Sequence, residues 1–320
     1  TKYYVWVKDV AGNISEVAST KTETVPKLTD ANATITKSPN DWTKQEVTAT
    51  ASTTEKNYTL QTKKDNGEWQ TTNTQKFTEN GTIYARLWDG TNAGEEIYKT
   101  ITNIDKTAPT ATNIEIKNVT PAGYDVYVYG VKDNGSGVNR VQFPTWTEAK
   151  GQDDIQLNWQ TGASSKGTKQ SDGTTWVYHV NITDHKTEAG EYNTHIYAYD
   201  NLENGKCIGT QKVTIPMVKI TYDENYVKDG TTNKQTVEKV YNTELGTLGT
   251  PTRTGYTFAG WYTEAAGGTR ISSTTKTPVT DTTYYAHWNA NPLNFANQTI
   301  SKTFSTSEQK ADITGASNGT

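Results

Sequence analysis

The sequence predicts an all-β protein built from several β-sandwich domains in tandem. Threonine, tyrosine, valine and tryptophan are abundant and no long run of alanine, leucine, glutamate and lysine occurs, a composition that favours strands over helices. A strand of alternating residues that ends at an aspartate before a Gly/Asn turn occurs three times, with the aspartates at Asp9, Asp89 and Asp200. This repetition indicates that three domains end in one kind of hairpin.

Each copy of this strand has an expected core face and an expected solvent face, because side chains alternate along a strand. The core face should carry Tyr3, Val5 and Val7 in the first copy, Ile83, Ala85 and Leu87 in the second, and Thr194, Ile196 and Ala198 in the third. The other face should be a wet surface of rings and charges. It comprises Tyr4, Trp6, Lys8, Tyr84, Arg86, Trp88, His195, Tyr197 and Tyr199.

The composition excludes several classes of protein. The 320 residues are enough for two or three domains. Only 32% of them are hydrophobic although 10% are aromatic, which predicts small cores with aromatic surfaces rather than disorder. The net charge of −4 argues against nucleic acid and anionic membranes as partners, and no apolar run is long enough for membrane insertion. Cys207 is the single cysteine, which excludes an internal disulfide and fits the cytosol or a Gram-positive surface equally well.

The order of the strands suggests a first boundary near residue 22 and a second near residue 107. The chain begins inside a strand and stops in mid-pattern, so we expect a fragment of a longer protein. Residues 1–22 should be the C-terminal hairpin of a truncated repeat, and residues 23–107 the first complete domain. Its expected strands cover residues 33–36, 46–50, 58–63, 69–72 and 83–89.

Two strings in this part match a known kind of repeat. They are Lys8–Asn13, KDVAGN, and the interdomain joint Asp105–Thr110, DKTAPT. With them the segment resembles the bacterial immunoglobulin-like repeats that occur in tandem on surface proteins. The resemblance implies an immunoglobulin-like sandwich without an active site.

Residues 108–217 form a larger unit with unusual strings. Strands are expected at 124–129 and 138–143, and the strings are FPTWTE at 143–148 and GQDDI at 151–155. Together with Asp184-His185 and the stretch 191–197, they resemble the repeat named after the Bsp protein of group B streptococcus. The resemblance implies a β-sandwich of secreted surface proteins and cell-wall hydrolases, usually next to a catalytic domain. The turn at 202–205 departs from that family.

Residues 218–290 have a different sequence pattern from the units before them. Strands are expected at 219–223, 237–241, 257–262 and 283–288. The string PTRTGYTFAGWY at 251–262, closed by YAHW at 285–288, resembles the Listeria-Bacteroides repeat, also known as the internalin B repeat. It implies a small β-grasp-like module with one short helical turn at 244–248. The family's Gly-Gly turn is missing at 224–226, so we expect a longer hairpin there. Residues 291–320 resemble the truncated start of another surface repeat.

Residues with catalytic or metal-binding potential are few, and no standard catalytic motif is present. Cys207 has no adjacent base in the sequence and is expected to be a bland thiol. His179, His185 and His195, with Asp184, fit no zinc spacing, so we expect surface histidines. The segment 133–137 can be read as a calcium loop, but it lacks the later bidentate glutamate, and a plain turn is favoured. No cofactor or metal is therefore predicted.

The candidate site residues are Trp146, Trp159, Trp176, Glu148 and Asp153. Glu148, Asp153 and the neighbouring Asp154 are the carboxylates that a glycosidase would need in a pair. Adjacent strand residues point to opposite faces, so turn or loop roles are favoured for Asp153 and Asp154. Three tryptophans in one domain exceed the single one that a sandwich core usually needs. They can stack on sugars or peptides, or they can pack in the core or at its rim, and both interpretations stand.

The sequence as a whole therefore predicts tandem immunoglobulin-like sandwiches followed by a β-grasp-like module. We expect a non-enzymatic stalk or spacer of a secreted or wall-attached bacterial surface protein, Gram-positive and extracellular. Its expected partners are cell-wall glycan or components of the host surface and matrix. The alternative is an accessory wall-binding region of a cell-wall hydrolase whose catalytic domain lies elsewhere.

Overall fold

The computed structural model describes residues 2–16, 18–21, 24–294 and 317–318. Strands dominate these residues, and two single-turn 3-10 helices, η1 (Ala163–Ser165) and η2 (Ile182–Asp184), interrupt them. The expected all-β class is confirmed. None of the helices in the described residues is long or apolar enough to cross a membrane. The chain divides into two compact units. One contains Thr1–Thr110, Lys132–Asn139 and Ala198–Lys206, and the other contains Ala111–Val131, Arg140–Tyr197 and Cys207–Thr320.

The N-terminal hairpin consists of β1 (Lys2–Val5) and β2 (Ala18–Lys21), which pair in antiparallel fashion. Val5 and Val7 are 55% and 69% exposed, and Trp6 on the other face is 57% exposed. The expectation that Val5 and Val7 face a core is therefore wrong. Within the described residues β1 and β2 form a sheet of two strands only, and no second layer covers either of its faces.

The first complete sandwich pairs two antiparallel three-stranded sheets, β3-β4-β6 and β5-β7-β8. Strand β7 shows the predicted alternation, because Ile83, Ala85 and Leu87 are fully buried. A strand expected at 69–72 is absent, and β6 forms a few residues later instead. The strands are β3 (Ala33–Ser38), β4 (Val47–Thr53), β5 (Thr59–Lys64), β6 (Thr74–Phe77), β7 (Gly81–Trp88) and β8 (Ile97–Ile101).

All three repeated aspartates shape the turn that follows their strand. Asp9 Oδ1 accepts a hydrogen bond from the backbone N–H of Asn13 at 2.8 Å, and Asp200 Oδ1 accepts one from the N–H of Asn204 at 2.7 Å. The turn after Asp200 thus keeps the hydrogen bond of the first copy although its residues differ. Asp89 Oδ1 accepts instead from the N–H groups two and three residues later. These bonds are Asx turns, which explain why aspartate stands at each position.

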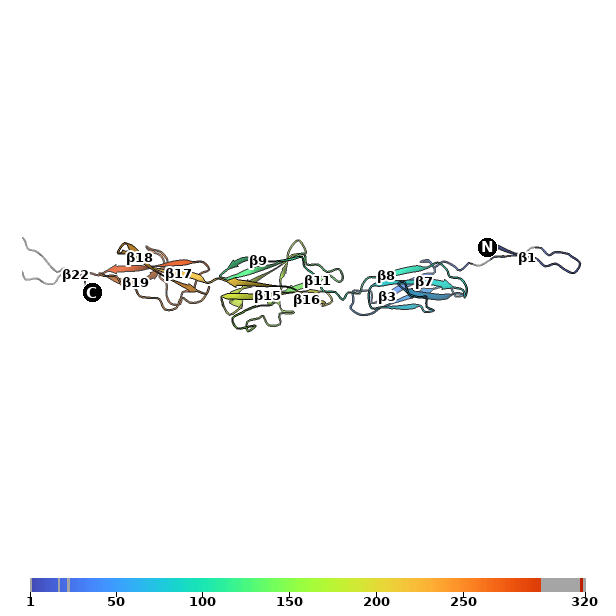
Figure 1. Ribbon diagram of the computed structural model, residues 1–320, viewed down its shortest axis with the longest axis horizontal. Coiled ribbons are helices and arrows are strands. Elements are labelled where there is room, and N and C mark those ends of the chain that lie inside the picture. The colour runs from blue at the N-terminus through green and yellow to red at the C-terminus, as the bar shows by residue number, and fades with distance from the viewer. Residues whose placement is uncertain (1, 17, 22–23, 295–316, 319–320) are drawn as a thin grey trace, which may run out of the picture. The chain divides into compact units, whose positions relative to one another are not determined.

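The middle module, residues 111–215, also packs two sheets. One is β13-β14-β10-β9, and the other is β11-β15-β12 with β16 paired to β15; Figure 1 shows β9 and β15 in separate layers. Thr194, Ile196 and Ala198 face the core as predicted. The strands are β9 (Asn113–Thr120), β10 (Gly123–Tyr129), β11 (Val138–Gln142), β12 (Thr145–Thr147), β13 (Thr168–Lys169), β14 (Trp176–Asn181), β15 (Gly190–Asp200) and β16 (Gly205–Ile215).

The C-terminal module has one mixed sheet in the order β18-β17-β20-β19, in which β17 and β20 run parallel. The helical turn expected at 244–248 is absent, and this stretch is turn and loop. The longer hairpin is confirmed, since β17 continues past a register shift to Lys228. The strands are β17 (Val218–Lys228), β18 (Thr231–Lys239), β19 (Tyr256–Tyr262) and β20 (Thr282–Ala290). Short β21 (Leu293–Asn294) pairs with β22 (Ser317–Asn318). Most of the expected truncated repeat lies outside the described residues.

Candidate functional site

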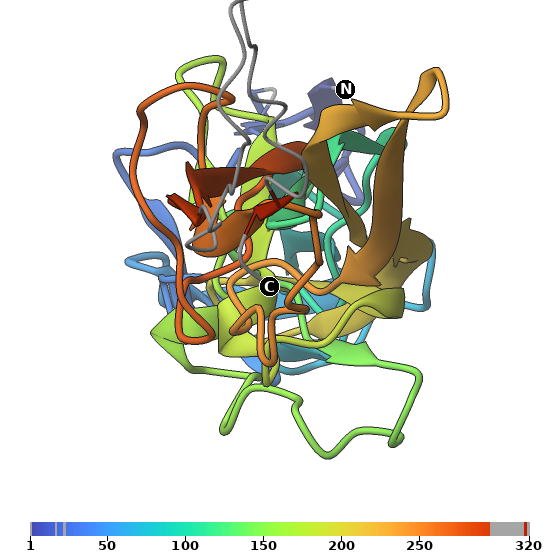
Figure 2. The same cartoon turned by 90° about the vertical axis from the view of Figure 1, so that its left-hand side faces the viewer.

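A long loop between β12 and β13, residues 148–167, contains the short η1 and packs Trp159 against Tyr197 on the outer face of β15. Loops longer than about 12–15 residues without regular structure are uncommon and usually functional. In Figure 2 part of this loop, coloured light green, extends beyond the strands. It contains Trp159 and Asp153, two of the predicted site residues. The loop is therefore a candidate recognition surface.

The first half of the loop is tied down through two buried or half-buried side chains. The carboxylate of Asp154 accepts hydrogen bonds from the backbone N–H of Thr147 at 3.1 and 3.2 Å. Gln156 accepts from the N–H of Thr145 at 3.0 Å and donates to the hydroxyl of Tyr178 at 3.0 Å. These bonds hold residues 154 and 156 against β12 and β14.

The second half of the loop is held over β11 by polar groups that it buries. Arg140 Nε and Gln142 Nε2 donate to the carbonyl of Gln160 at 3.1 and 3.3 Å. Ser165 Oγ donates to the carbonyl of Trp159 at 2.7 Å. Gln142 and Ser165 are fully buried. His195, Tyr197 and Tyr199 on the face expected to be wet are half-buried, and polar groups on β11 bond the loop.

Four rings form a row on the outer face of β15, here named the ring row: Trp146, His195, Tyr197 and Trp159. His195 and Tyr197 are two residues apart and so share this face. The ring of Trp146 meets His195 edge-on at 4.7 Å between centroids, and Trp159 meets Tyr197 at 4.7 Å with a 44° tilt. All four rings are half-buried. Two residues before Trp159, Leu157 is 88% exposed.

The structure brings only some of the predicted site residues together. Trp146 and Trp159 lie in the ring row, whereas Trp176 is only 4% exposed and belongs to the core. Glu148 accepts a hydrogen bond from the side-chain amide of Asn193, beside the row. Asp153 is ion-paired with Lys186 Nζ at 2.5 Å on the surface, while its neighbour Asp154 is buried. Leu157 and Tyr197 were not predicted as site residues, because a lone apolar or aromatic residue in a loop or strand carries no signal of its own. His195 was weighed only as a metal ligand.

The predicted histidines occupy separate environments. His179 pairs with Asp125 at 2.6 Å on the exposed face of β14, and His195 lies in the ring row. His185 is fully buried rather than at the surface, which corrects the expectation for this residue. Its Nδ1 lies 3.2 Å from the carbonyl of Asp154, and among the described residues its Nε2 has no hydrogen-bond partner.

Burial of His185 predicts a stability that depends on pH. Burial lowers the pKa of His185 below its usual value, although the nearby Asp154 acts in the opposite direction. As the pH falls, His185 of the unfolded chain is therefore protonated first, near pH 6.5. The stability of the middle module should therefore fall progressively below about pH 6.5 and level off once His185 titrates in the folded state. Melting temperatures measured from about pH 7.5 to about pH 5 test this.

A matched variant isolates this effect. His185→Gln cannot titrate and should show a shallower decline of melting temperature over the same pH range. His195, whose pKa burial also lowers, should contribute to the slope that remains. Equal slopes in the wild type and His185→Gln would contradict the assignment.

Three carboxylates from separate segments meet beside the joint that follows the first sandwich. They belong to Asp105, Asp133 and Asp200, and one oxygen of each lies within 4.8 Å of the others. Among the described residues, this is the one group of three Asp, Glu, His or Cys side chains placed closely enough to hold a metal ion. Such oxygens suit a hard cation. Burial would raise the pKa of Asp105, but hydrogen bonds from the N–H groups of Ser136 and Thr107 lower it to about 2.

Backbone donors already hold each carboxylate of this cluster. Asp133 Oδ2 accepts from the N–H of Gly135 and of Gly137, at 3.0 and 2.8 Å, so the segment 133–137 forms the favoured turn. The N–H of Ser136 bonds Asp105 at 2.7 Å. These hydrogen bonds make the cluster a network that connects the interdomain joint to two loops. Sequence reasoning missed it, because its members are far apart along the chain.

Comparison with known families assigns the two C-terminal modules. Residues 112–213 match the model of the GBS Bsp-like repeat, and residues 219–287 match that of the Listeria-Bacteroides repeat domain. The expected resemblances of these two modules to the Bsp-like and Listeria-Bacteroides repeats are confirmed.

Two solved structures align with parts of this chain at low sequence identity. The FN1–FN3 domains of chicken CNTN1 are 14% identical, with 67% of this chain and 77% of that chain covered, at a TM-score of 0.28. The fibronectin(III)-like modules of Clostridium thermocellum CbhA are 14% identical, with 57% and 94% covered, at a TM-score of 0.23.

Proposed function

We propose that this chain is a stalk segment of a secreted or wall-attached surface protein, and that its Bsp-like repeat binds cell-wall glycan. The modules supply length, while the ring row supplies the contact. The two roles are compatible because the ring row and its covering loop occupy one face of one module. The Gram-positive wall is the expected setting.

The ring row is the observation that supports glycan binding. Half-buried rings present a flat apolar face at little cost in conformational entropy. Trp146 and Trp159 are held against His195 and Tyr197, so their orientation does not have to be ordered when a sugar arrives. Glu148, bonded to Asn193 at the end of the row, adds a carboxylate that can accept sugar hydroxyls.

A sedimentation assay on purified bacterial cell wall tests the proposal. The whole chain should bind, and Trp146→Ala and Trp159→Ala should each weaken binding roughly tenfold, because ring contacts are worth about 0.5–1.5 kcal/mol beyond the area they bury. Tyr98→Ala removes a ring that is 69% exposed on the first sandwich and should leave binding unchanged.

Two outcomes argue against wall binding. If the wild type does not sediment with the wall, the stalk role stands without a glycan contact. The wild type could instead bind immobilised host matrix proteins. If Leu157→Ala abolishes that binding and Trp146→Ala does not, the loop 148–167 binds a protein partner.

The second candidate, an accessory region of a cell-wall hydrolase, predicts the same wall binding. It differs in requiring a catalytic domain elsewhere in the same gene product. Sequencing the flanking gene in both directions distinguishes the two, and a hydrolase domain there would favour the second.

A further inference from the structure

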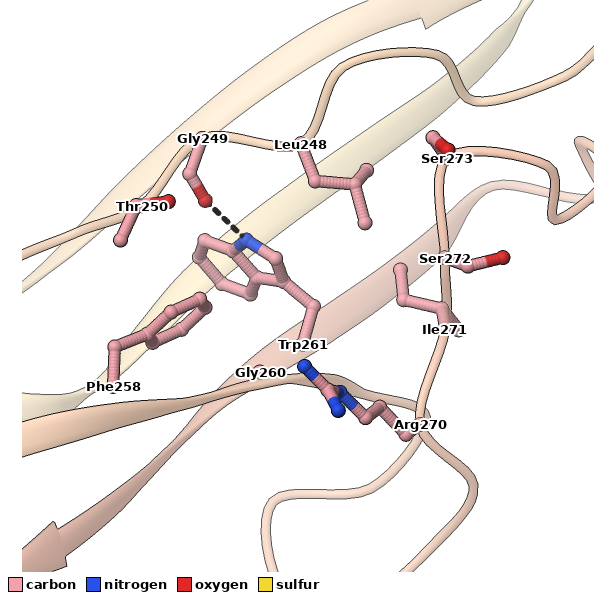
Figure 3. Close-up of a pocket in the computed structure, with 10 residues that line it drawn as sticks. All are labelled: Leu248, Gly249, Thr250, Phe258, Gly260, Trp261, Arg270, Ile271, Ser272 and Ser273. Carbon is pink, nitrogen blue, oxygen red and sulfur yellow. Dashed lines mark hydrogen bonds between the residues drawn. The ribbon is translucent and has the colours of Figure 1, made fainter.

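The C-terminal module contains a pocket of about 370 Å³ beside the bulged part of strand β19. Its volume is at the lower end of those that hold small ligands. Figure 3 shows its lining, which combines an apolar floor with a polar rim. The residues that line it include Trp261, Phe258, Leu248, Arg270, Gly260 and Gly249.

The floor of the pocket is aromatic and rigid. The ring of Trp261 is 5% exposed, and its Nε1 donates to the carbonyl of Gly249 at 2.7 Å. Phe258 meets it at 5.6 Å between centroids in an edge-on arrangement. Leu248 approaches from the opposite wall (Figure 3). These side chains offer a preformed apolar surface for a group about the size of one hydrophobic side chain.

Arg270 places a positive charge at this apolar floor. Its side chain lies over Gly260, where an added Cβ would come within 2.6 Å of Arg270 Nε. Gly260 has φ +133° at a register shift of β19, so glycine both permits the bulge and leaves room for the guanidinium. Among the described residues no hydrogen bond, ion pair or ring contact joins the Arg270 side chain.

The rim also offers an acceptor. The carbonyl of Gly249 uses one lone pair for the indole N–H, and a carbonyl oxygen can accept a second hydrogen bond. A ligand that fills the pocket can therefore present a carboxylate to Arg270, an apolar group to Trp261 and an N–H to Gly249.

We propose that this pocket binds the free carboxyl terminus of a peptide that ends in an apolar residue. A guanidinium binds a carboxylate through two parallel hydrogen bonds, and the last peptide N–H lies close to that carboxylate. The apolar side chain then covers Trp261 and Leu248. This site is independent of the ring row, because it lies in a different module and uses different chemistry.

The test is an NMR titration of the whole isotope-labelled chain with N-acetyl-glycyl-leucine. The indole N–H signal of Trp261, identified by its loss in Trp261→Phe, should shift and saturate with a Kd on the order of a millimolar. The same peptide with an amidated C-terminus should bind at least about tenfold more weakly, because a hydrogen bond to a charged group contributes about 1.5–3 kcal/mol.

Variants of two arginines in one module make the test specific. Arg270→Gln should weaken binding roughly tenfold to a hundredfold for the same reason. Arg253→Gln should leave the Kd unchanged, since the guanidinium of Arg253 stacks on Tyr256 at 3.7 Å outside the pocket. A dispersed spectrum of free Arg270→Gln, with shifts confined to signals from residues around the pocket, verifies that the module remains folded.

Ligand analogues distinguish the possible sources of the carboxylate. N-acetyl-diglycine, which lacks the apolar group, should bind more weakly, and phenylacetate, which lacks the amide, should also bind more weakly. Equal binding of the amidated peptide, equal binding of phenylacetate, or full affinity in Arg270→Gln would each overturn the proposal.

Discussion

Replacing Trp176 by alanine should lower the free energy of unfolding of the Bsp-like repeat by about 3–5 kcal/mol, the usual cost of removing a large buried ring. Trp176 begins β14, pairs with Val128 of β10 and is 4% exposed. Its Nε1 has no hydrogen-bond partner among the described residues, so its loss leaves no acceptor unsatisfied and the cost comes from the cavity.

Calorimetry of the whole chain measures this effect, with hydrogen exchange over residues 112–213 assigning the transition that moves. A domain of this size changes its melting temperature by about 4–8 °C per kcal/mol. Trp176→Ala should therefore lower it by more than about 10 °C. Trp176→Phe, which keeps a ring, should cost less, and Trp146→Ala should cost less because Trp146 is only half-buried. If Trp176→Ala lowers the free energy of unfolding by less than about 1 kcal/mol, Trp176 is not a core residue and is again a candidate ligand contact.

Replacing Asn103 by alanine should destabilise the first sandwich by about 2–4 kcal/mol, since each hydrogen bond contributes about 0.5–1.5 kcal/mol net. Asn103 is 5% exposed and its side chain joins two distant segments. It accepts from Lys37 Nζ at 2.6 Å and donates to the carbonyls of Pro39 and Asp41 at 3.0 and 2.8 Å. Alanine would leave these groups without their partner at the end of the core.

The control for Asn103 is an asparagine of the same sandwich outside any such network. Asn66 lies exposed in the turn between β5 and β6, and Asn66→Ala should stay within about 0.5 kcal/mol of the wild type. Chemical denaturation followed by hydrogen exchange over residues 24–110 gives both values. Equal stability of Asn103→Ala and Asn66→Ala would show that the network contributes nothing.

The sequence alone located most strands and turns of this protein. Strand β7 alternates between buried Ile83, Ala85 and Leu87 and half-buried neighbours, as period two requires. The aspartates Asp9 and Asp200 cap their turns through equivalent bonds, because a short acceptor side chain reaches the backbone of its own turn. These features are local, so the chain needs no distant partner to define them.

The tertiary structure decided which side chains are buried and which residues from distant segments come together. Val5 sits in a strand that alternates as β7 does and is nevertheless 55% exposed, because no second layer among the described residues covers its hairpin. Trp146 and Trp176 are equivalent as sequence signals, yet the loop 148–167 and the opposing sheet place one in the ring row and one in the core. Arg270 reaches the floor of its pocket only because Gly260 leaves space there. The residue pattern determines which faces a strand has, whereas the packing of segments far apart in the chain decides which face is covered.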